Sequence, residues 1–247
     1  PYIEMGGVVY AGVDYHEILE NAEKEADIII WDGGNNDYPF YRPDLHITIA
    51  DPHRAGHELG YYPGEINIRM ADVVVVNKVE TAKEEDILTV ERNVKGINPG
   101  VSIIRASSPI QVEGDINGKR VVVVEDGPTV THGGMPYGAG AIAAQQHGAE
   151  MVDPRPYAVG SIKETFQKYP HLKTVLPAMG YGEHQIKELE ETINAVECDA
   201  VLAATPINLA RVVNVNKPVI RARYGVGDET AQKLAEILEE FLKTHNL

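Results

Sequence analysis

The chain has 247 residues, of which 43% are hydrophobic and 24% are charged, and its formal net charge is −15. This composition is typical of a globular protein, and no run of about 18 apolar residues long enough to span a membrane occurs. The acidic balance and the absence of a Lys/Arg run argue against nucleic acid as a partner. Cys198 is the only cysteine, and no secretory signal is visible, so we expect a cytoplasmic protein without disulfides and without a membrane partner.

Apolar runs alternate with segments of helical period, which predicts an α/β fold with mostly parallel sheets covered by helices. The expected strands are Asp27–Trp31, Leu45–Ala50, Val73–Val76, Val101–Arg105, Val121–Val124, Thr174–Leu176, Ala200–Ala203 and Val219–Ala222. The expected helices are Tyr15–Glu25, Lys83–Val94, Ala139–His147, Glu183–Ala195 and Glu229–Lys243.

A domain boundary is expected near residues 108–118, because Pro109, Gly114, Asp115 and Gly118 lie there between two strands. We therefore predict one α/β unit over residues 1–110 and a second over residues 111–247.

The most informative motif is the apolar run Ile28–Trp31 followed by Asp32, Gly33 and Gly34. A buried parallel strand that ends in this way brings a carboxylate to the edge of a sheet, where it can hold Mg²⁺ beside the phosphates of a nucleotide. Asp32 is thus the expected metal ligand, and the two glycines belong to the expected cofactor loop. A buried strand and turn without chemistry is the alternative.

A second motif, Asn77-Lys78-x-Glu80, follows the expected strand 73–76. Many P-loop proteins read a purine with Asn-Lys-x-acid, so Asn77 and Lys78 are expected to face the base. Glu80 is longer than the Asp that pairs with guanine, which leaves the choice between ATP and GTP open. An exposed turn at a strand end is the other interpretation.

Between these motifs, residues 50–65 read ADPHRAGHELGYYPGE. His53, Arg54 and His57 would form a bed for phosphate beyond a strand end. A metal site that also uses Glu58 is a second interpretation, and a polar surface loop is a third.

The second unit carries a glycine-rich loop after the expected strand 121–124. Thr129, Thr131 and His132 supply side-chain donors, and Gly133 and Gly134 let the backbone approach an anion closely. The loop lacks the lysine of the G-x-x-x-x-G-K-[ST] phosphate loop. A tight strand-to-helix turn explains part of this pattern equally well.

Three later turns place Arg155, the pair Gly180 and Gly182, and Thr205 near further strand or helix ends, which suggests that several loops converge at one sheet edge. His171 and the histidines on helix faces are interpreted as background.

Several long stretches together resemble the cyclic 2,3-diphosphoglycerate synthetase family over essentially the whole chain, as a carboxyl-terminal portion that lacks the upstream P-loop. The matching stretches are residues 9–15, 31–45, 51–65, 69–82, 122–140 and 152–161.

The resemblance implies an ATP-dependent ligase that closes an intramolecular phosphoanhydride in 2,3-diphosphoglycerate and releases ADP and phosphate. The implied partners are ATP, Mg²⁺ and this small anionic substrate, and the implied assembly is a homo-oligomer, namely a dimer. Asp32 would serve Mg²⁺, and Asn77 and Lys78 would face the base. The residues that would neutralise the substrate's phosphates are His53, Arg54, His57, His132, Arg155 and Arg42.

Two other classes of function remain open at this point. One is a regulatory or metal-delivery GTPase or ATPase of the P-loop class, which the Asn-Lys-x-acid motif and the His53–His57 pair favour. The other is an α/β interaction module that binds no nucleotide.

Overall fold

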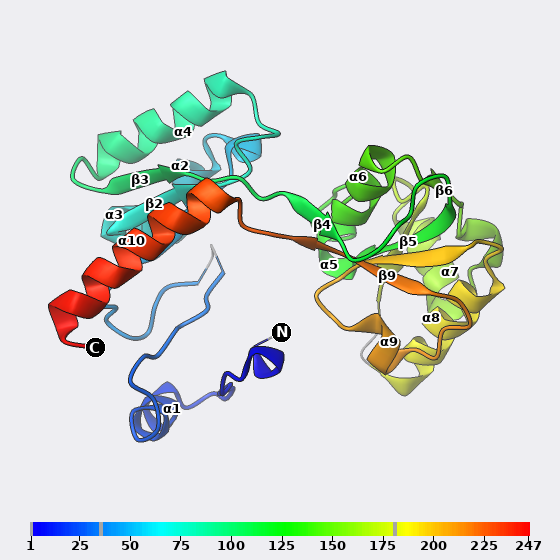
Figure 1. Ribbon diagram of the computed structural model, residues 1–247, viewed down its shortest axis with the longest axis horizontal. Coiled ribbons are helices and arrows are strands. Elements are labelled where there is room, and N and C mark those ends of the chain that lie inside the picture. Colours follow the sequence, from blue (N-terminus) through cyan, green and yellow to red (C-terminus); the bar gives the residue numbers. More distant parts are fainter. Residues whose placement is uncertain (1, 35–36, 180–181) are drawn as a thin grey trace. The chain divides into compact units, whose positions relative to one another are not determined.

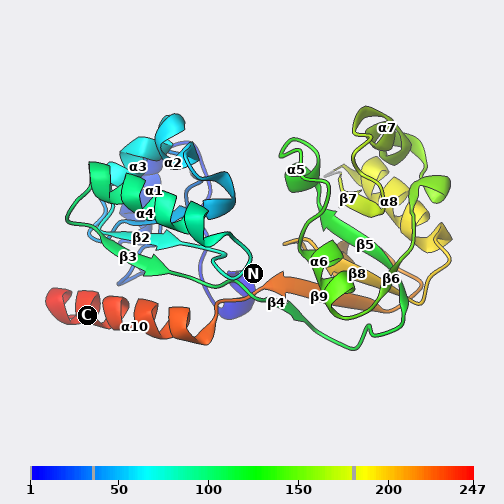
Figure 2. The same ribbon diagram turned by 90° about the horizontal axis from the view of Figure 1, so that it is seen from above.

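The computed structural model describes residues 2–34, 37–179 and 182–247 and has an α/β fold, as predicted. The chain forms two compact units (Figures 1 and 2). Residues up to Pro109 and the last segment, Val226–Leu247, form the first unit, and Ile110–Gly225 form the second.

The first unit is built on three parallel strands in the order β1-β2-β3. These are β1 (Ile47–Ala50), β2 (Val73–Val76) and β3 (Ser102–Arg105). The helices that follow or precede them are α2 (His57–Gly60), α3 (Gly64–Met70), α4 (Glu84–Ile97) and α10 (Asp228–His245).

Four consecutive valines make β2 apolar on both faces, so both faces must be covered. Val74 and Val76 pack with α3 and α4, whereas Val73 and Val75 face the other side together with Leu234 of α10. Figure 1 shows α4 and α10 on opposite sides of this sheet. The sequence-based division places α10 with the second unit, but in the structure this helix packs against the first.

The expected strand Asp27–Trp31 is wrong. Residues 28–31 follow α1 (Tyr15–Ala22) as irregular chain, and Ile28 and Ile30 are 50% and 85% exposed. A short 3₁₀ turn, η1 (Ile3–Met5), precedes them. An apolar run becomes a buried strand only when a neighbouring strand accepts its backbone hydrogen bonds, and no described strand pairs with this segment.

The second unit has a larger sheet with the strand order β4-β9-β8-β5-β6, in which β7 also pairs with β5. Its strands are β4 (Ile110–Val112), β5 (Arg120–Asp126), β6 (Glu150–Met151), β7 (Val175–Ala178), β8 (Ala200–Ala204) and β9 (Val219–Tyr224). All pairs are parallel except β4 with β9.

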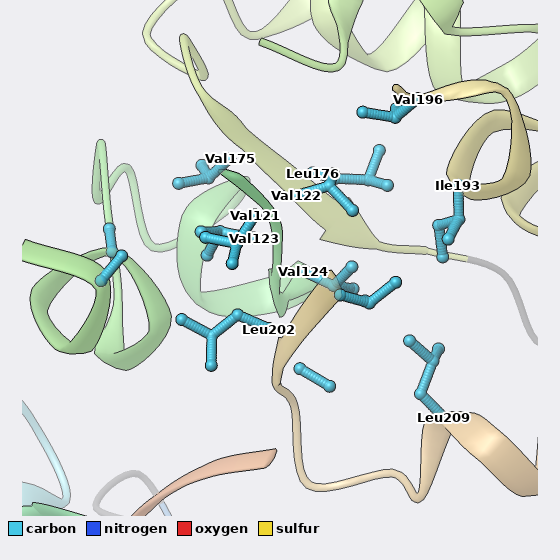
Figure 3. Close-up of a cluster of buried hydrophobic side chains, with 14 of the residues drawn as sticks. Val121, Val122, Val123, Val124, Val175, Leu176, Ile193, Val196, Leu202 and Leu209 are labelled. Atoms are coloured by element: carbon cyan, nitrogen blue, oxygen red, sulfur yellow. The ribbon is translucent and has the colours of Figure 1, made fainter. Parts of the chain in front are cut away.

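The helical segments of this unit are α5 (Gly127–Val130), α6 (Ala139–Gln146), η3 (Arg155–Tyr157), α7 (Gly160–Lys168), α8 (Glu183–Ala195) and α9 (Leu209–Val212). Figure 3 shows the core, in which Val121–Val124 of β5 lie among Leu202, Ile193 and Leu209. Because β5 is apolar on both faces, it can lie in the middle of the sheet.

The helix α6 lies unusually close to the sheet. A Cβ atom added at Gly140 would come within 2.6 Å of Cγ1 of Val123 and 2.9 Å of Cβ of Ala204. Neither of these neighbours has a flexible end that can move aside. Glycine at residue 140 therefore lets α6 rest directly on β5 and β8.

We predict that Gly140→Ala destabilises the second unit by about 1–3 kcal/mol, because the added methyl group overpacks the helix–sheet contact. Gly96→Ala is the matched control, since Gly96 also lies in a helix and a Cβ there meets nothing within 4 Å. This control is expected to gain up to about 1 kcal/mol from helix propensity. Chemical unfolding of both variants tests the pair, and equal effects would contradict the packing argument.

Candidate functional site

In the first unit, the predicted residues gather where β1 and β2 end. Asp51 follows β1 and Lys78 follows β2, and the Lys78 Nζ lies 3.6 Å from Oδ2 of Asp51. Lys78 adopts a φ of 59°, a left-handed conformation that costs a non-glycine residue about 1 kcal/mol or more. Strained residues of this kind concentrate at functional sites.

His53 joins the same cluster through Thr81. The His53 Nε2 lies 2.9 Å from Oγ1 of Thr81, whose hydroxyl donates to the carbonyl of Lys78 at 3.2 Å. Asp51 also caps the short turn η2 (Pro52–Arg54) by accepting from the backbone amide of His53. The ends of β1 and β2 are thereby linked by side-chain contacts.

Glu80 is bound to the end of the third strand of this sheet. Its Oε1 accepts from the backbone amide of Ser108 at 2.8 Å, and the amide of Asn77 donates to the carbonyl of Ala50 at 3.0 Å. The Asn77-Lys78-x-Glu80 motif thus lies at the carboxyl edge of the sheet, where open α/β sheets bind their ligands.

The metal interpretation of residues 53–58 finds no support in the structure. Glu58 accepts from the amide of Gly56 at 2.8 Å and from Nδ2 of Asn93 at 2.7 Å, and His57 packs on the ring of Tyr61. Over residues 2–34, 37–179 and 182–247, no group of three or more His, Cys, Asp or Glu side chains is placed to hold a metal ion. Arg54, within this segment, is exposed.

Asp32, the predicted magnesium ligand, lies in exposed irregular chain. Its Oδ2 accepts from the hydroxyl of Tyr2 at 2.8 Å, and this hydrogen bond raises the pKa of Tyr2. The amide of Gly34 donates to Asp37 at 2.7 Å. The adjacent Asn35 and Asn36 lie outside the described residues. Mg²⁺ keeps several waters and needs only one or two protein carboxylates, so the role of Asp32 stays a prediction.

The second unit has a site position of its own. After β5 the chain forms β6 and then β7, which both pair with β5, before it forms β8, which pairs with the other side of β5. Such a reversal of strand order creates a crevice beyond the carboxyl ends of the two central strands. Asp126 ends β5 and Thr205 follows β8, so the glycine-rich loop lies where a ligand is expected.

Glu125 belongs to β5, and its side-chain carboxyl group lies at the start of α6. Its Oε1 accepts from the amides of Gly138 at 3.1 Å and Ala141 at 2.9 Å, and the residue is only 2% exposed. Burial raises the pKa of this carboxyl group, and the backbone amides partly offset the rise. Sequence reasoning missed this role, although a Glu after four buried valines was a visible signal. The chain's own carboxyl group thus occupies the start of a helix, a position that can otherwise bind an anion.

The predicted loop residues contact one another around α5. Asp126 accepts from the amide and the hydroxyl of Thr129 and so caps α5. Thr131 is 3% exposed and donates to the carbonyl of Gly127 at 2.7 Å, and His132 Nδ1 lies 3.1 Å from the same hydroxyl oxygen.

The two loop glycines bond within the loop. The amide of Gly133 donates to Pro128 at 2.9 Å, and the amide of Gly134, whose φ is 65°, donates to Thr131 at 3.1 Å. Their predicted role as an anion cradle stays a prediction.

Arg155, predicted to meet a substrate phosphate, forms a bidentate ion pair with Asp153. Its Nη2 lies 2.6 Å from Oδ2 and its Nε lies 2.9 Å from Oδ1 of that carboxylate, which holds the pKa of Asp153 below its ordinary range. Gly182 precedes α8 as expected, and Gly180 lies outside the described residues. The structure thus brings together one set of predicted residues in each unit.

Comparison with known proteins supports the resemblance. Residues 4–107 match the family described as "Cyclic 2,3-diphosphoglycerate synthetase, P-loop domain". The chain is a relative of the cyclic 2,3-diphosphoglycerate synthetases. It is 26% identical over 117 residues to the protein of that name from Pyrococcus furiosus, covering 45% of this chain and 27% of that protein. The protein from Methanothermus fervidus is 23% identical over 185 residues, with 72% and 39% covered.

A third relative is much more similar. The chain is 60% identical over 246 residues to the protein named arginine synthetase ArcE from Thermococcus kodakarensis. The match covers 98% of this chain and 55% of that protein, so the chain spans about half the length of this relative. These relatives are all named as synthetases. No described helix is both long enough and apolar enough to cross a membrane.

We predict that Glu125→Gln changes how stability depends on pH. A raised pKa in the folded state means that the folded protein holds the proton more tightly than the unfolded chain. The stabilisation from this group is complete below the pKa of the unfolded carboxyl group and is lost as pH rises through the folded pKa. Wild type should therefore lose stability relative to Glu125→Gln as pH rises above the ordinary pKa of a glutamate and through the raised folded pKa, as measured by urea unfolding. A constant difference would contradict the assignment.

Proposed function

We propose that the chain is part of an ATP- and Mg²⁺-dependent synthetase whose product is arginine. The observation that carries this proposal is the 60% identity to arginine synthetase ArcE over 98% of the chain. The relatives that make cyclic 2,3-diphosphoglycerate share 23–29% identity over 40–72% of the chain. Cyclic 2,3-diphosphoglycerate formation, which the sequence stretches implied, is the second candidate and rests on the match of residues 4–107.

Both candidates use the same chemical plan. An oxygen of the acceptor first attacks the γ-phosphate of ATP, so that ADP leaves and the acceptor becomes activated. A second nucleophile then displaces phosphate from the activated acceptor. In the second candidate this nucleophile is the other phosphate of the same molecule. Making the guanidinium group of arginine in this way requires a nitrogen nucleophile instead.

The charge of the predicted site fits a less anionic substrate than 2,3-diphosphoglycerate. The two phosphates of that molecule need several cations around them. Arg155 is already forked to Asp153, and Lys78 lies near Asp51. The chain as a whole carries a net charge of −15. Arg54, His53 and His57 remain the predicted contacts for the phosphates of the nucleotide or of the activated acceptor.

The nucleotide is proposed to bind the first unit. Asn77 and Lys78 lie at the end of β2 with Glu80 held against Ser108, which suits a base contact at the sheet edge. Asp32 is the proposed Mg²⁺ ligand. The regulatory GTPase alternative predicts a preference for GTP, so every assay should compare ATP with GTP. The homodimer and the cytoplasmic location stay predictions.

The product can be tested directly by running the reaction backwards. The intact enzyme, given arginine, ADP, phosphate and Mg²⁺, should form ATP, which luciferase detects as it appears. Omission of arginine should abolish the signal, and GDP should not replace ADP. Asn77→Ala should reduce the signal about tenfold or more, through lost positioning of the base.

The second candidate is tested on the same preparation. Phosphorus NMR of the enzyme with ATP, Mg²⁺ and 2,3-diphosphoglycerate should show no cyclic pyrophosphate if the first proposal is right. A cyclic pyrophosphate resonance without any arginine-dependent ATP would reverse the order of the two candidates.

A further inference from the structure

Three groups in the second unit form a short hydrogen-bonded chain. The Thr131 hydroxyl lies 2.7 Å from the carbonyl oxygen of Gly127 and 3.1 Å from Nδ1 of His132. Thr131 is 3% exposed, whereas His132 lies on the surface. A buried threonine therefore connects a fixed backbone carbonyl to an accessible imidazole ring.

The hydrogens of this chain can be assigned from the groups themselves. A carbonyl oxygen only accepts, and the Thr131 hydroxyl lies closer to Gly127 than to the ring, at 2.7 Å against 3.1 Å, which assigns its single hydrogen to Gly127. The hydroxyl then has only lone pairs left for His132, so Nδ1 of the ring must donate to it. Nδ1 therefore carries a proton, and in the neutral ring Nε2 carries none.

We propose that His132 is a proton acceptor through Nε2 and that Thr131 is the positioning residue that fixes this tautomer. This assignment differs from a cationic role toward substrate phosphates, because a neutral ring with a bare Nε2 attracts an N–H or O–H group. Across the described residues, Nε2 of His132 has no hydrogen-bond partner of its own. The arrangement follows the general pattern of a base oriented by a third group.

The ring is also held from the side by the end of α7. Tyr169 meets His132 edge-on with 6.0 Å between ring centroids, and it meets His171 in the same way at 6.0 Å. His171 is itself fixed, since its Nε2 donates to the carbonyl of Val130 at 2.7 Å. Lys168 places its Nζ 5.3 Å from the centre of the Tyr169 ring.

The use of this base rests on the proposed function. When the nitrogen nucleophile bonds to the activated carbon, the carbon–oxygen bond breaks and phosphate leaves with its electrons. The nitrogen must give up a proton, which Nε2 of His132 accepts and later passes to solvent. A phosphate oxygen as nucleophile carries no proton at neutral pH, so ring closure in 2,3-diphosphoglycerate would not need this group.

The tautomer can be read by NMR of the chain labelled with ¹⁵N-histidine. The signal of His132, identified by its loss in His132→Gln, should be that of an Nδ1–H ring at neutral pH. Thr131→Ser keeps the hydroxyl and should keep this signal. Thr131→Val removes the hydroxyl and should shift the ring toward the Nε2–H form that histidine prefers in water.

Thr165→Val is the matched control for Thr131→Val. Thr165 is also buried in the second unit, and its hydroxyl also donates to the carbonyl four residues earlier, that of Ser161, at 2.8 Å. Among the described residues, no hydrogen bond joins the Thr165 hydroxyl to a histidine. This variant should have a similar cost in stability but should leave the His132 signal unchanged.

In the intact enzyme, His132→Gln should lower kcat about 10²- to 10⁴-fold, the usual contribution of general base catalysis. Thr131→Val should lower kcat about tenfold or more with little change in KM. Thr131→Ser, which keeps the hydroxyl, should retain the kcat of the wild type. An Nε2–H signal for wild-type His132, or full activity of His132→Gln, would overturn the proposal. Absence of arginine formation together with an Nδ1–H signal would refute the proposed function and leave the tautomer assignment standing.

Discussion

The start of α6 rests so closely on β5 and β8 that residue 140 has no room for a side chain. This contact brings the first amides of the helix to Glu125, a carboxylate that the end of β5 buries in the sheet. The carboxylate satisfies amides that would otherwise have no partner at the helix start. The loop between β5 and α6 is therefore held at both of its ends, at residues 126 and 138.

The contacts of this loop indicate a different chemistry for the second unit than the phosphate binding that its glycines alone predict. Glu125 accepts hydrogen bonds at the helix start, and the amides of Gly133 and Gly134 donate within the loop, so these backbone donors already have partners in this unit. The imidazole of His132 is exposed in this loop, and its Nδ1 contacts the hydroxyl of the buried Thr131. The phosphate chemistry instead fits the first unit, where the ends of β1 and β2 hold Lys78 in a strained conformation near Asp51 and His53.

Much of the fold could be predicted from the sequence because the strands in the two sheets are short apolar runs bounded by turns. The segment Ile28–Trp31 has the same pattern and is not a strand, since pairing depends on a neighbour that local sequence cannot reveal. The helix α7 was missed because its polar residues hide the buried face of Ile162 and Phe166. In the site, the residue types alone do not indicate that Arg155 pairs with Asp153 or that the Glu125 side chain accepts from the amide of Ala141.

The account depends most on where the hydrogens lie between Gly127 and His132, since this decides whether the ring is a base or a cation. Neutron crystallography of the deuterated enzyme at neutral pH observes these atoms directly. The account predicts a deuteron on Nδ1 of His132, none on Nε2, and a Thr131 hydroxyl deuteron directed at the carbonyl of Gly127. A deuteron on Nε2, whether or not Nδ1 also carries one, would contradict it.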